Sequence, residues 1–574
     1  MARLTQLVSA LCLATTAVAQ EKTPTLADLL PADSPVYLDF KTPTPEEMAQ
    51  LAYYKCMQNP ALRKVLEGGA AKDGQLTAME MPLGPGRFSM HVDVGDSQYP
   101  LSFTYEDKKG RRKIQIENYI GLALAGFRDS QEMPLDLVLA IRTRGDAAEA
   151  LTTIKRIGAA AMAGHALADV DETMGLVYKE VEYRERKYTQ ATMGPLSIYA
   201  AAVGRMVVVT VDEGRIRDIL DRHLDGAADA LSRDARHKRA LKADTEGTRT
   251  ISLAVHVDRL VAAAERMYGV KNLKNFRAGM KALGLDNLET LALSAHVDGA
   301  GFTSDLSLLF SSPDRKGIAE LFAPGEPATF DALRFAPKES LYATAGRFDA
   351  GTIWKILSML PGTNLDRVED RFKLQHGFDL RADLLDQLGP EGGFIVASNH
   401  GLLPDIGIVC KTKNAEKVQA SLTKLVENQP WPEGTGPRHV KFGNVKAVVV
   451  PMMHYKIGIV PLAPTFGVVD GQLLITPFPL TFQRFLAVQQ GRRPSLEQNR
   501  DYARLRQRVP EDALSLSYMD VKRLLAIVYD TFMPIVQCLP QAEGSTHIYQ
   551  LPDVGLFTQY LYGSIGWRTA DERG

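Results

Sequence analysis

Cysteine is scarce in this chain, which has four among its 574 residues. Cys12 lies in an N-terminal segment expected to be removed, so Cys56, Cys410 and Cys538 remain, and they allow at most one intramolecular disulfide. A fold held by several disulfides is therefore excluded. No two cysteines have the short spacing of a thiolate zinc site. Cys410 ends an alternating, strand-like run, which predicts a buried thiol that acts as a small core residue.

An excess of charge of either sign is also missing. The 67 Lys and Arg residues face 68 Asp and Glu residues, a formal net charge of -1. A general binder of nucleic acid or other polyanions is therefore excluded. With 45% hydrophobic and 24% charged residues, the composition is that of a globular protein, and it excludes collagen-like, disordered and multi-span membrane classes.

Long hydrophobic runs are absent after the first residues, where a cleavable export signal is expected at 1–19. Arg3 supplies the positive start, an apolar stretch covers residues 7–14, and Ala17-Val18-Ala19 forms a cleavage site before Gln20. The alternative is a buried N-terminal helix. No later stretch approaches the roughly 18 apolar residues of a membrane helix. We therefore expect a soluble, exported product, periplasmic or extracellular, with no transmembrane segment after cleavage.

Internal repeats give the main information on organisation. Residues 31–39 and 337–342 share a Pro and an acidic residue before a strand-like run, and residues 251–258 and 510–516 form a second pair. Further matches follow in the same order: 83–88 with 388–394, 137–144 with 406–413, 203–209 with 470–475, and 231–239 with 495–503. This order predicts a duplication with halves at 24–325 and 326–574.

Each half combines hairpin signals with strand-to-helix steps. Asp470-Gly471 and Asp298-Gly299 lie between apolar runs, as in tight hairpins. Asp146 and Asn414 precede helical patterns as caps. We expect an α+β fold in each half, with antiparallel or mixed sheets and helices packed on one face. The strand after Gly299 has no expected counterpart in the second half.

Several short segments suggest a family. They are Leu30-Pro31-Ala32-Asp33-Ser34-Pro35-Val36-Tyr37 with Asn59-Pro60 and Leu66, the segment from Gly377-Phe378-Asp379-Leu380 to Leu388-Gly389, and the segment from Ser495-Leu496 to Tyr502. In these segments the chain resembles the uncharacterised exported bacterial proteins grouped as domain of unknown function 3352. The resemblance covers most of the chain after residue 19. It implies export and an α+β architecture, and it implies no catalytic residue.

The tripeptide His-Val-Asp occurs three times, at His91, His256 and His296. In a strand, residues i and i+2 face the same side, so each histidine and its aspartate could together bind a divalent metal. The alternative is structural, because the aspartates of the second and third copies suit a helix N-cap and a hairpin. We expect the structural role, since the second half does not preserve the histidines.

Nucleophile and phosphate motifs are missing. The chain has no G-x-S-x-G elbow, no H-E-x-x-H and no Walker A loop. Residues 421–424 match S-x-x-K, but the S-D-N and K-T-G elements of that enzyme class are absent. Residues 389–393 are glycine-rich but are expected to lead into a strand rather than a helix, so they lack a phosphate site. We predict no catalytic, cofactor-binding or metal-binding residues and no cofactor.

Two basic clusters lie at residues 108–113 and 233–242. Solvated turns and faces explain most such clusters, and the alternative is a patch for an anionic polymer or membrane. Neither contains interleaved aromatic residues, which argues against nucleic acid.

The leading hypothesis is a non-enzymatic binding or structural component of the periplasm or cell exterior. Its partner is unknown, with an envelope component or another protein as candidates. The alternative is a hydrolase or metal-dependent enzyme with a site between the two halves, for which His91, His256 and His296 would converge. A third hypothesis, an envelope adaptor, predicts salt-sensitive binding to anionic membranes through residues 108–113.

Overall fold

A computed structural model describes most of the chain. The described residues are 24–41, 45–51, 55, 59, 71–72, 75–83, 86–93, 101–107, 110–127, 134–143, 145–155, 177–193, 196–242, 249–269, 271, 273–299, 301–359, 365–399, 403–432, 435–457, 460–538 and 553–574. They fall into two compact units. Unit 1 takes those within Met1–Arg277, Asn287–Ser311 and Gln541–Leu556, and unit 2 takes those within Ala278–Asp286, Ser312–Pro540 and Phe557–Gly574.

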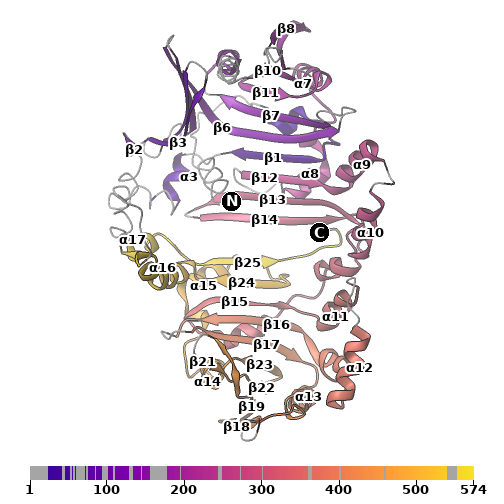
Figure 1. Ribbon diagram of the computed structural model, residues 1–574, viewed down its shortest axis with the longest axis vertical. Helices are drawn as coiled ribbons and strands as arrows, with labels where there is room; N and C mark the ends of the chain where they lie inside the picture. The colour runs from indigo at the N-terminus through magenta and orange to yellow at the C-terminus, as the bar shows by residue number, and fades with distance from the viewer. Residues whose placement is uncertain are drawn as a thin grey trace. The chain divides into compact units, whose positions relative to one another are not determined.

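Unit 1 is built on one antiparallel sheet, whose ten main strands follow the order β14-β13-β12-β1-β6-β7-β11-β10-β9-β8 (Figure 1). The first half of the long strand β6 continues into a branch formed by β5, β4, β3 and β2. The strands are β1 (Val36–Lys41), β2 (Ala71–Lys72), β3 (Gln75–Leu83), β4 (Gly86–Asp93), β5 (Leu101–Asp107), β6 (Gly110–Phe127), β7 (Leu135–Thr143), β8 (Val177–Tyr183), β9 (Arg186–Met193), β10 (Leu196–Val203), β11 (Met206–Thr210), β12 (Arg249–His256), β13 (Leu288–Asp298) and β14 (Gly301–Phe310).

Helices cover one face of this sheet over most of its width. Helix α7 packs on β10 and β11, α8 on β13 and β14, and α9 on β13 and β6. The helix at residues 147–155 instead packs on the opposite face, against Val207 and Val209 of β11. The other helices described in unit 1 are α2 (Leu26–Leu29), α3 (Pro45–Gln50), α7 (Glu213–Asp225), η1 (Leu231–Arg233), α8 (Ala235–Ala240) and α9 (Val257–Tyr268).

Unit 2 contains a nine-stranded antiparallel sheet in the order β18-β19-β22-β23-β17-β16-β15-β24-β25, and a separate pair, β20 and β21 (Figure 1). The strands are β15 (Ser340–Arg347), β16 (Leu388–Ala397), β17 (Asp405–Thr412), β18 (Arg438–Phe442), β19 (Val445–Val449), β20 (Met452–Ile457), β21 (Val460–Leu462), β22 (Thr465–Val469), β23 (Gln472–Thr476), β24 (Ser515–Met519) and β25 (Ser564–Arg568).

Helices lie on both faces of this sheet as well. Phe482 and Phe485 of α14 enter the main core on one face, and Val418 of α13 enters a second core on the other. The helices are η2 (Gly317–Phe322), η3 (Asp331–Phe335), α11 (Ala350–Met359), α12 (Leu365–His376), η4 (Leu380–Leu384), η5 (Leu385–Gln387), α13 (Ala415–Glu427), α14 (Pro479–Gln489), η6 (Leu496–Gln498), α15 (Arg500–Arg506) and α16 (Val521–Gln537), while α10 (Lys274–Ala282) and α17 (Val554–Thr558) cross between the ranges of the two units.

The two units repeat one α+β architecture, as expected. Strands β15, β16, β17, β23, β22, β24 and β25 follow the neighbour order of β1, β6, β7, β11, β10, β12 and β13. Two isolated bridges mark the same point in each unit, Pro31 with Ala230 and Pro337 with Ser495. The predicted turn at Asp470-Gly471 is confirmed, with positive φ angles of 47° and 75° in a two-residue hairpin.

Two expectations about the repeats are corrected. Leu83 ends β3 and residues 86–88 begin β4 in the branch, whereas residues 388–394 lie in β16, which corresponds to β6, so the two segments are not equivalent. The glycine-rich residues 389–393 are also part of β16 itself rather than a loop before it. Gly393 lies so close to the carbonyl of Thr344 on β15 that a Cβ would come within 2.5 Å of it. The glycines therefore serve strand packing.

A buried ion pair ties helix to sheet at the same place in both units. In unit 2, Asp405 at the start of β17 is 3% exposed and accepts hydrogen bonds from Arg484 and Thr481 of α14, at 2.9 and 2.7 Å. In unit 1, Asp136 of β7 pairs with Arg215 of α7 at 2.9 Å. The pair is therefore a feature that both units share, although no sequence motif marked it.

Replacing Asp405 with asparagine is expected to destabilise unit 2 by about 3 kcal/mol, because the Arg484 charge loses its partner in a largely buried place. Urea denaturation of the two proteins at pH 7 measures this loss. The control is Asp314→Asn, since Asp314 pairs with Lys316 at 3.3 Å and both side chains are exposed. That change is expected to cost less than about 0.5 kcal/mol. Equal losses in the two variants would refute the role of the buried pair.

Candidate functional site: an apolar sheet face in unit 1

The His-Val-Asp histidines do not gather into one site. His256 ends β12 opposite Thr290 of β13, whereas His296 lies six residues further along β13, opposite Arg249. Six residues of strand span about 20 Å, so these two imidazoles are too far apart to share a metal ion. His91 lies on β4, and its side chain is outside the described part of the structure.

The aspartates of the second and third copies have structural roles, one of them not as expected. Asp258 is not the N-cap of α9. The helix begins at Val257, so His256 takes the N-cap position, and Asp258 in the first turn pairs with Arg236 at 2.8 Å. Asp298 is part of the β13–β14 hairpin, as predicted, and accepts a hydrogen bond from Thr303 at 3.1 Å.

His256 instead belongs to a buried pair that the sequence did not indicate. Its Nε2 lies 3.3 Å from Nδ1 of His237 on α8, and its Nδ1 lies 2.9 Å from the Thr290 hydroxyl. Burial lowers the pKa of His237 to about 4 and that of His256 to about 3. Both rings are therefore neutral at pH 7. Unit 2 has Tyr502 and Asp520 at the corresponding positions, so the histidine pair is confined to unit 1.

A second buried polar cluster lies beneath the same helices. The Tyr119 hydroxyl accepts a hydrogen bond from the backbone N–H of Leu26 at 2.7 Å and lies 3.4 Å from the Tyr37 hydroxyl. Asp39, two residues along β1, is 3% exposed, and burial raises the pKa of its carboxyl. These contacts connect α2 to the sheet, which is a structural role.

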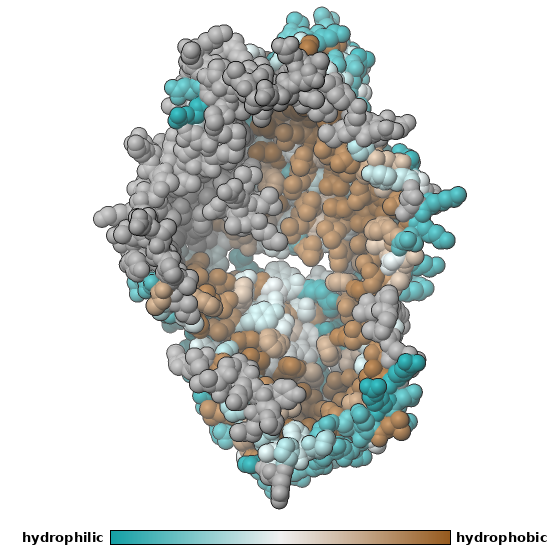
Figure 2. Space-filling model, in the orientation of Figure 1, coloured by the Kyte–Doolittle hydropathy of each residue, from teal (hydrophilic) through white to brown (hydrophobic). Residues whose placement is uncertain are grey.

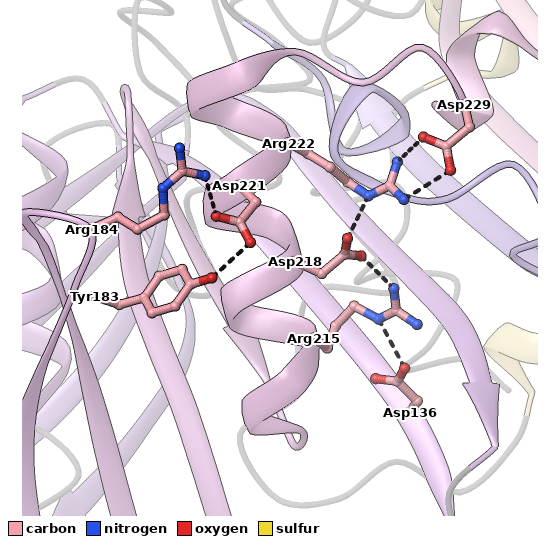
Figure 3. A network of polar contacts seen from close by, with 8 residues as sticks. All are labelled: Asp136, Tyr183, Arg184, Arg215, Asp218, Asp221, Arg222 and Asp229. Carbon is pink, nitrogen blue, oxygen red and sulfur yellow. Dashed lines mark hydrogen bonds and ion pairs between the residues drawn. The ribbon is translucent and has the colours of Figure 1, made fainter.

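Charged side chains on α7 form a network of opposite charges, drawn in Figure 3. Figure 3 draws the pairs of Arg215 with Asp136 and Asp218, of Arg222 with Asp218 and Asp229, and of Arg184 with Asp221, to which the Tyr183 hydroxyl also donates. Arg184 also pairs with Asp225, which the figure does not draw. Each arginine pairs with at least two aspartates, so none of the three guanidinium groups lacks a carboxylate partner. These pairs connect α7 to β7 and to the β8–β9 turn, which is a structural role.

Other motifs singled out in the sequence are structural where they are described. The Ser421 hydroxyl on α13 is buried and donates to the carbonyl of Asp383 at 2.9 Å, so the S-x-x-K match is a packing feature. In the basic cluster at 233–242, Arg236 and Lys242 pair with Asp258 and Asp305. Cys410 is buried, as predicted, and burial raises the pKa of its thiol to about 11.

Two further predictions concern the basic cluster at residues 108–113 and Cys56. Lys108, Lys109 and Cys56 lie outside the described residues, and the side chains of residues 111–113 on β6 do as well. Among the residues that the structure describes, no group of three His, Cys, Asp or Glu side chains could hold a metal ion. In the same part of the chain, no helix has the length and apolar character needed to cross a membrane.

The face of the unit 1 sheet opposite α7, α8 and α9 carries an unusual set of side chains. Across β7, β6, β1, β12, β13 and β14, the strand registers place them in three rows, which we call the apolar grid. The first row is Leu137, Leu124, Val36, Val255, Leu291 and Leu308; the second is Leu139, Leu122, Leu38, Leu253, Leu293 and Leu306; the third is Ile141, Ile120, Phe40, Ile251, Ala295 and Ser304.

No side chain of the apolar grid is fully buried, and Leu122 and Leu306 are 43% and 67% exposed. Their neighbours on the helix-covered face are small and buried, among them Ala123, Ala254 and Ala292. Figure 2 shows the grid side of unit 1 as a hollowed surface of brown, hydrophobic atoms. Large apolar residues therefore occupy the grid face, whereas the helix-covered face carries both small residues and large ones such as Tyr37 and Tyr119. A sheet with one solvated face would carry polar residues on that face instead.

Comparison with known proteins gives no match that bears on this surface. No family model, no curated protein and no solved structure matches the chain.

The second unit provides an internal comparison instead. The positions of unit 2 that correspond to the grid, in the same rows and without a counterpart of β14, are Ile406, Val396, Tyr342, Met519 and Ser564; Ile408, Phe394, Thr344, Ser517 and Gly566; and Cys410, Gly392, Gly346, Ser515 and Arg568. Serine, threonine, glycine and arginine occupy more than half of these positions. The shared architecture therefore folds without an apolar surface here, so the grid of unit 1 is not a requirement of the fold.

A sequence signal for the grid does exist. Its strands alternate large apolar residues with Ala or Ser, as in Leu291-Ala292-Leu293-Ser294 and Ile251-Ser252-Leu253-Ala254. Such strands carry large apolar residues on one face and small residues on the other, unlike the charged and polar face of a half-solvated sheet. This pattern does not indicate which face of the sheet the helices cover.

Proposed function

We propose that this chain is an exported, non-enzymatic binding protein of the cell envelope, and that the apolar grid is its binding surface. The observation that carries the proposal is the difference between the units: the same sheet face is apolar at every position except Ser304 in unit 1 and mixed in unit 2. Export and envelope location rest on the N-terminal sequence and on the resemblance to exported proteins of domain of unknown function 3352.

Energetics support a binding role. Each square ångström of apolar surface removed from water contributes about 25 cal/mol, and monomeric proteins rarely expose large contiguous apolar patches. Leu122, Leu253 and Leu306 are partly exposed. A partner that covers these leucines removes their apolar surface from water, and this burial contributes to the free energy of binding. No residue of the grid itself is charged, so apolar contact is the attraction that this surface offers.

The experiment is photo-crosslinking in the native envelope. A photoreactive amino acid replaces Leu122 in the middle of the grid, and the matched control replaces Leu374, which is 87% exposed on α12 of unit 2. We expect an adduct with an envelope component at position 122 and none of that mass at position 374. Equal adducts at both positions, or none at 122, would contradict the proposed binding surface.

A further inference from the structure

We infer that the occupant of the apolar grid is the acyl chain of a lipid, an inference that rests on the proposed function. The first reason is the chemistry of the surface. Every grid position except Ser304, at the edge, is an aliphatic or aromatic side chain without a hydrogen-bonding group. Protein interfaces usually include about one hydrogen bond per 100–200 Å². A hydrocarbon chain has no hydrogen-bonding groups, so its binding to this surface leaves no hydrogen bond unmade.

The second reason is the size of the side chains. Under α8, which covers the other face of the grid strands, the strand residues include the small Ala254 and Ala292. The grid presents leucine, isoleucine and phenylalanine instead. These side chains keep a helix further from the backbone, whereas a thin, flexible chain can lie in the grooves between their rows.

The third reason is the size of the grid. Six adjacent strands span about 24 Å, and three rows along the strands span about 13 Å. One leaflet of a bilayer core is about 15 Å deep, so one or two extended acyl chains fit across these rows. No grid residue is charged. The headgroup therefore lies beyond the rows, and chain length rather than headgroup charge sets the affinity.

The test measures binding of fatty acids by calorimetry, with the mature chain purified and delipidated. Decanoic, dodecanoic, tetradecanoic and hexadecanoic acids are compared below their aggregation concentrations. We expect the affinity to rise about twofold to fourfold for each added methylene, with a negative heat-capacity change. Hexadecyl maltoside and hexadecyltrimethylammonium are expected to bind within about tenfold of hexadecanoic acid, because no charge in the grid distinguishes them.

Two results would overturn the inference: affinities that do not depend on chain length, or binding that requires one headgroup charge. The crosslinking experiment tests the proposed binding function separately from the acyl-chain inference. If position 122 crosslinks in the envelope to a protein and purified chain binds no fatty acid, the grid is a protein interface, so the inference fails while the binding function stands. If position 122 gives no adduct and fatty acids do not bind, both fail.

Discussion

Replacing Leu122 with glutamate is expected to weaken hexadecanoic acid binding at least about 100-fold, which corresponds to about 2.7 kcal/mol. Leu122 lies in the middle row, between Leu139 and Leu38. An acyl chain over this position would cover the new carboxylate, and removing a charge from water without a partner costs more than this amount. The unliganded protein tolerates the change, because the side chain is 43% exposed and its carboxylate reaches water.

The matched control is Phe394→Glu. Phe394 holds the equivalent position in the middle row of unit 2 and is 37% exposed. If binding belongs to the unit 1 grid, this variant keeps the affinity of the original chain. Circular dichroism and the urea midpoint confirm that both variants are folded. Unchanged binding in Leu122→Glu, or an equal loss in Phe394→Glu, would exclude the grid as the site.

The stability of unit 1 is expected to fall by about 4 kcal/mol between pH 7 and pH 5, about 2 kcal/mol for each histidine of the buried pair. Both pKa values are lowered in the folded state, to about 4 for His237 and about 3 for His256. Below pH 6.5 the unfolded chain therefore takes up protons that the folded chain excludes. The contribution of the two histidines to the stability of unit 1 is therefore fully present above pH 6.5. It is lost as the pH falls toward the folded-state pKa values of about 4 and about 3.

The surroundings explain why the folded pair rejects protons. A second proton would leave two N–H groups facing each other across the 3.3 Å contact between the rings. Arg259 and Arg236 oppose a positive charge on His256, and Arg249 and Arg259 oppose one on His237. Asp234 favours the protonated forms of both, but burial outweighs it.

Urea denaturation at pH 7 and pH 5 measures this effect in the original chain and in His256→Asn, which keeps a side chain suited to the N-cap. The variant is expected to lose about 2 kcal/mol less over this range, because one titrating group is gone. His296→Asn, a partly exposed position on the same sheet, is the control and is expected to follow the original chain. If all three proteins lose the same stability, the buried pair does not govern the acid response.

Local features of the fold were predictable from the sequence. Asp470-Gly471 predicts a two-residue hairpin because both residues adopt positive φ readily, and the structure has that turn. Asn414 caps α13 through its side chain, at 3.0 Å from the N–H of Lys417. The repeated Pro31 and Pro337 segments lead into equivalent strands. Each of these depends on a few neighbouring residues, which is why the sequence reveals it.

The apolar grid and the histidine pair depend on distant residues. Leu122, Leu38 and Leu253 become neighbours only through the registers of β6, β1 and β12, and a shift by one residue would turn each leucine toward the helices. His237 and His256 meet because α8 packs over the end of β12. Neither register nor packing can be read from hydrophobic periodicity alone, so neither feature could be predicted from the sequence.

The most direct test of the grid as an acyl-chain site is to locate a bound chain. Hexadecanoic acid with a photoreactive diazirine in mid-chain is bound to the purified chain and irradiated, and the labelled peptides are identified by mass spectrometry. The predicted labels fall on β6, β1, β12 and β13, around Leu122, Leu38, Leu253 and Leu293. Labels on the equivalent strands of unit 2, or spread over both units without preference, would contradict the account.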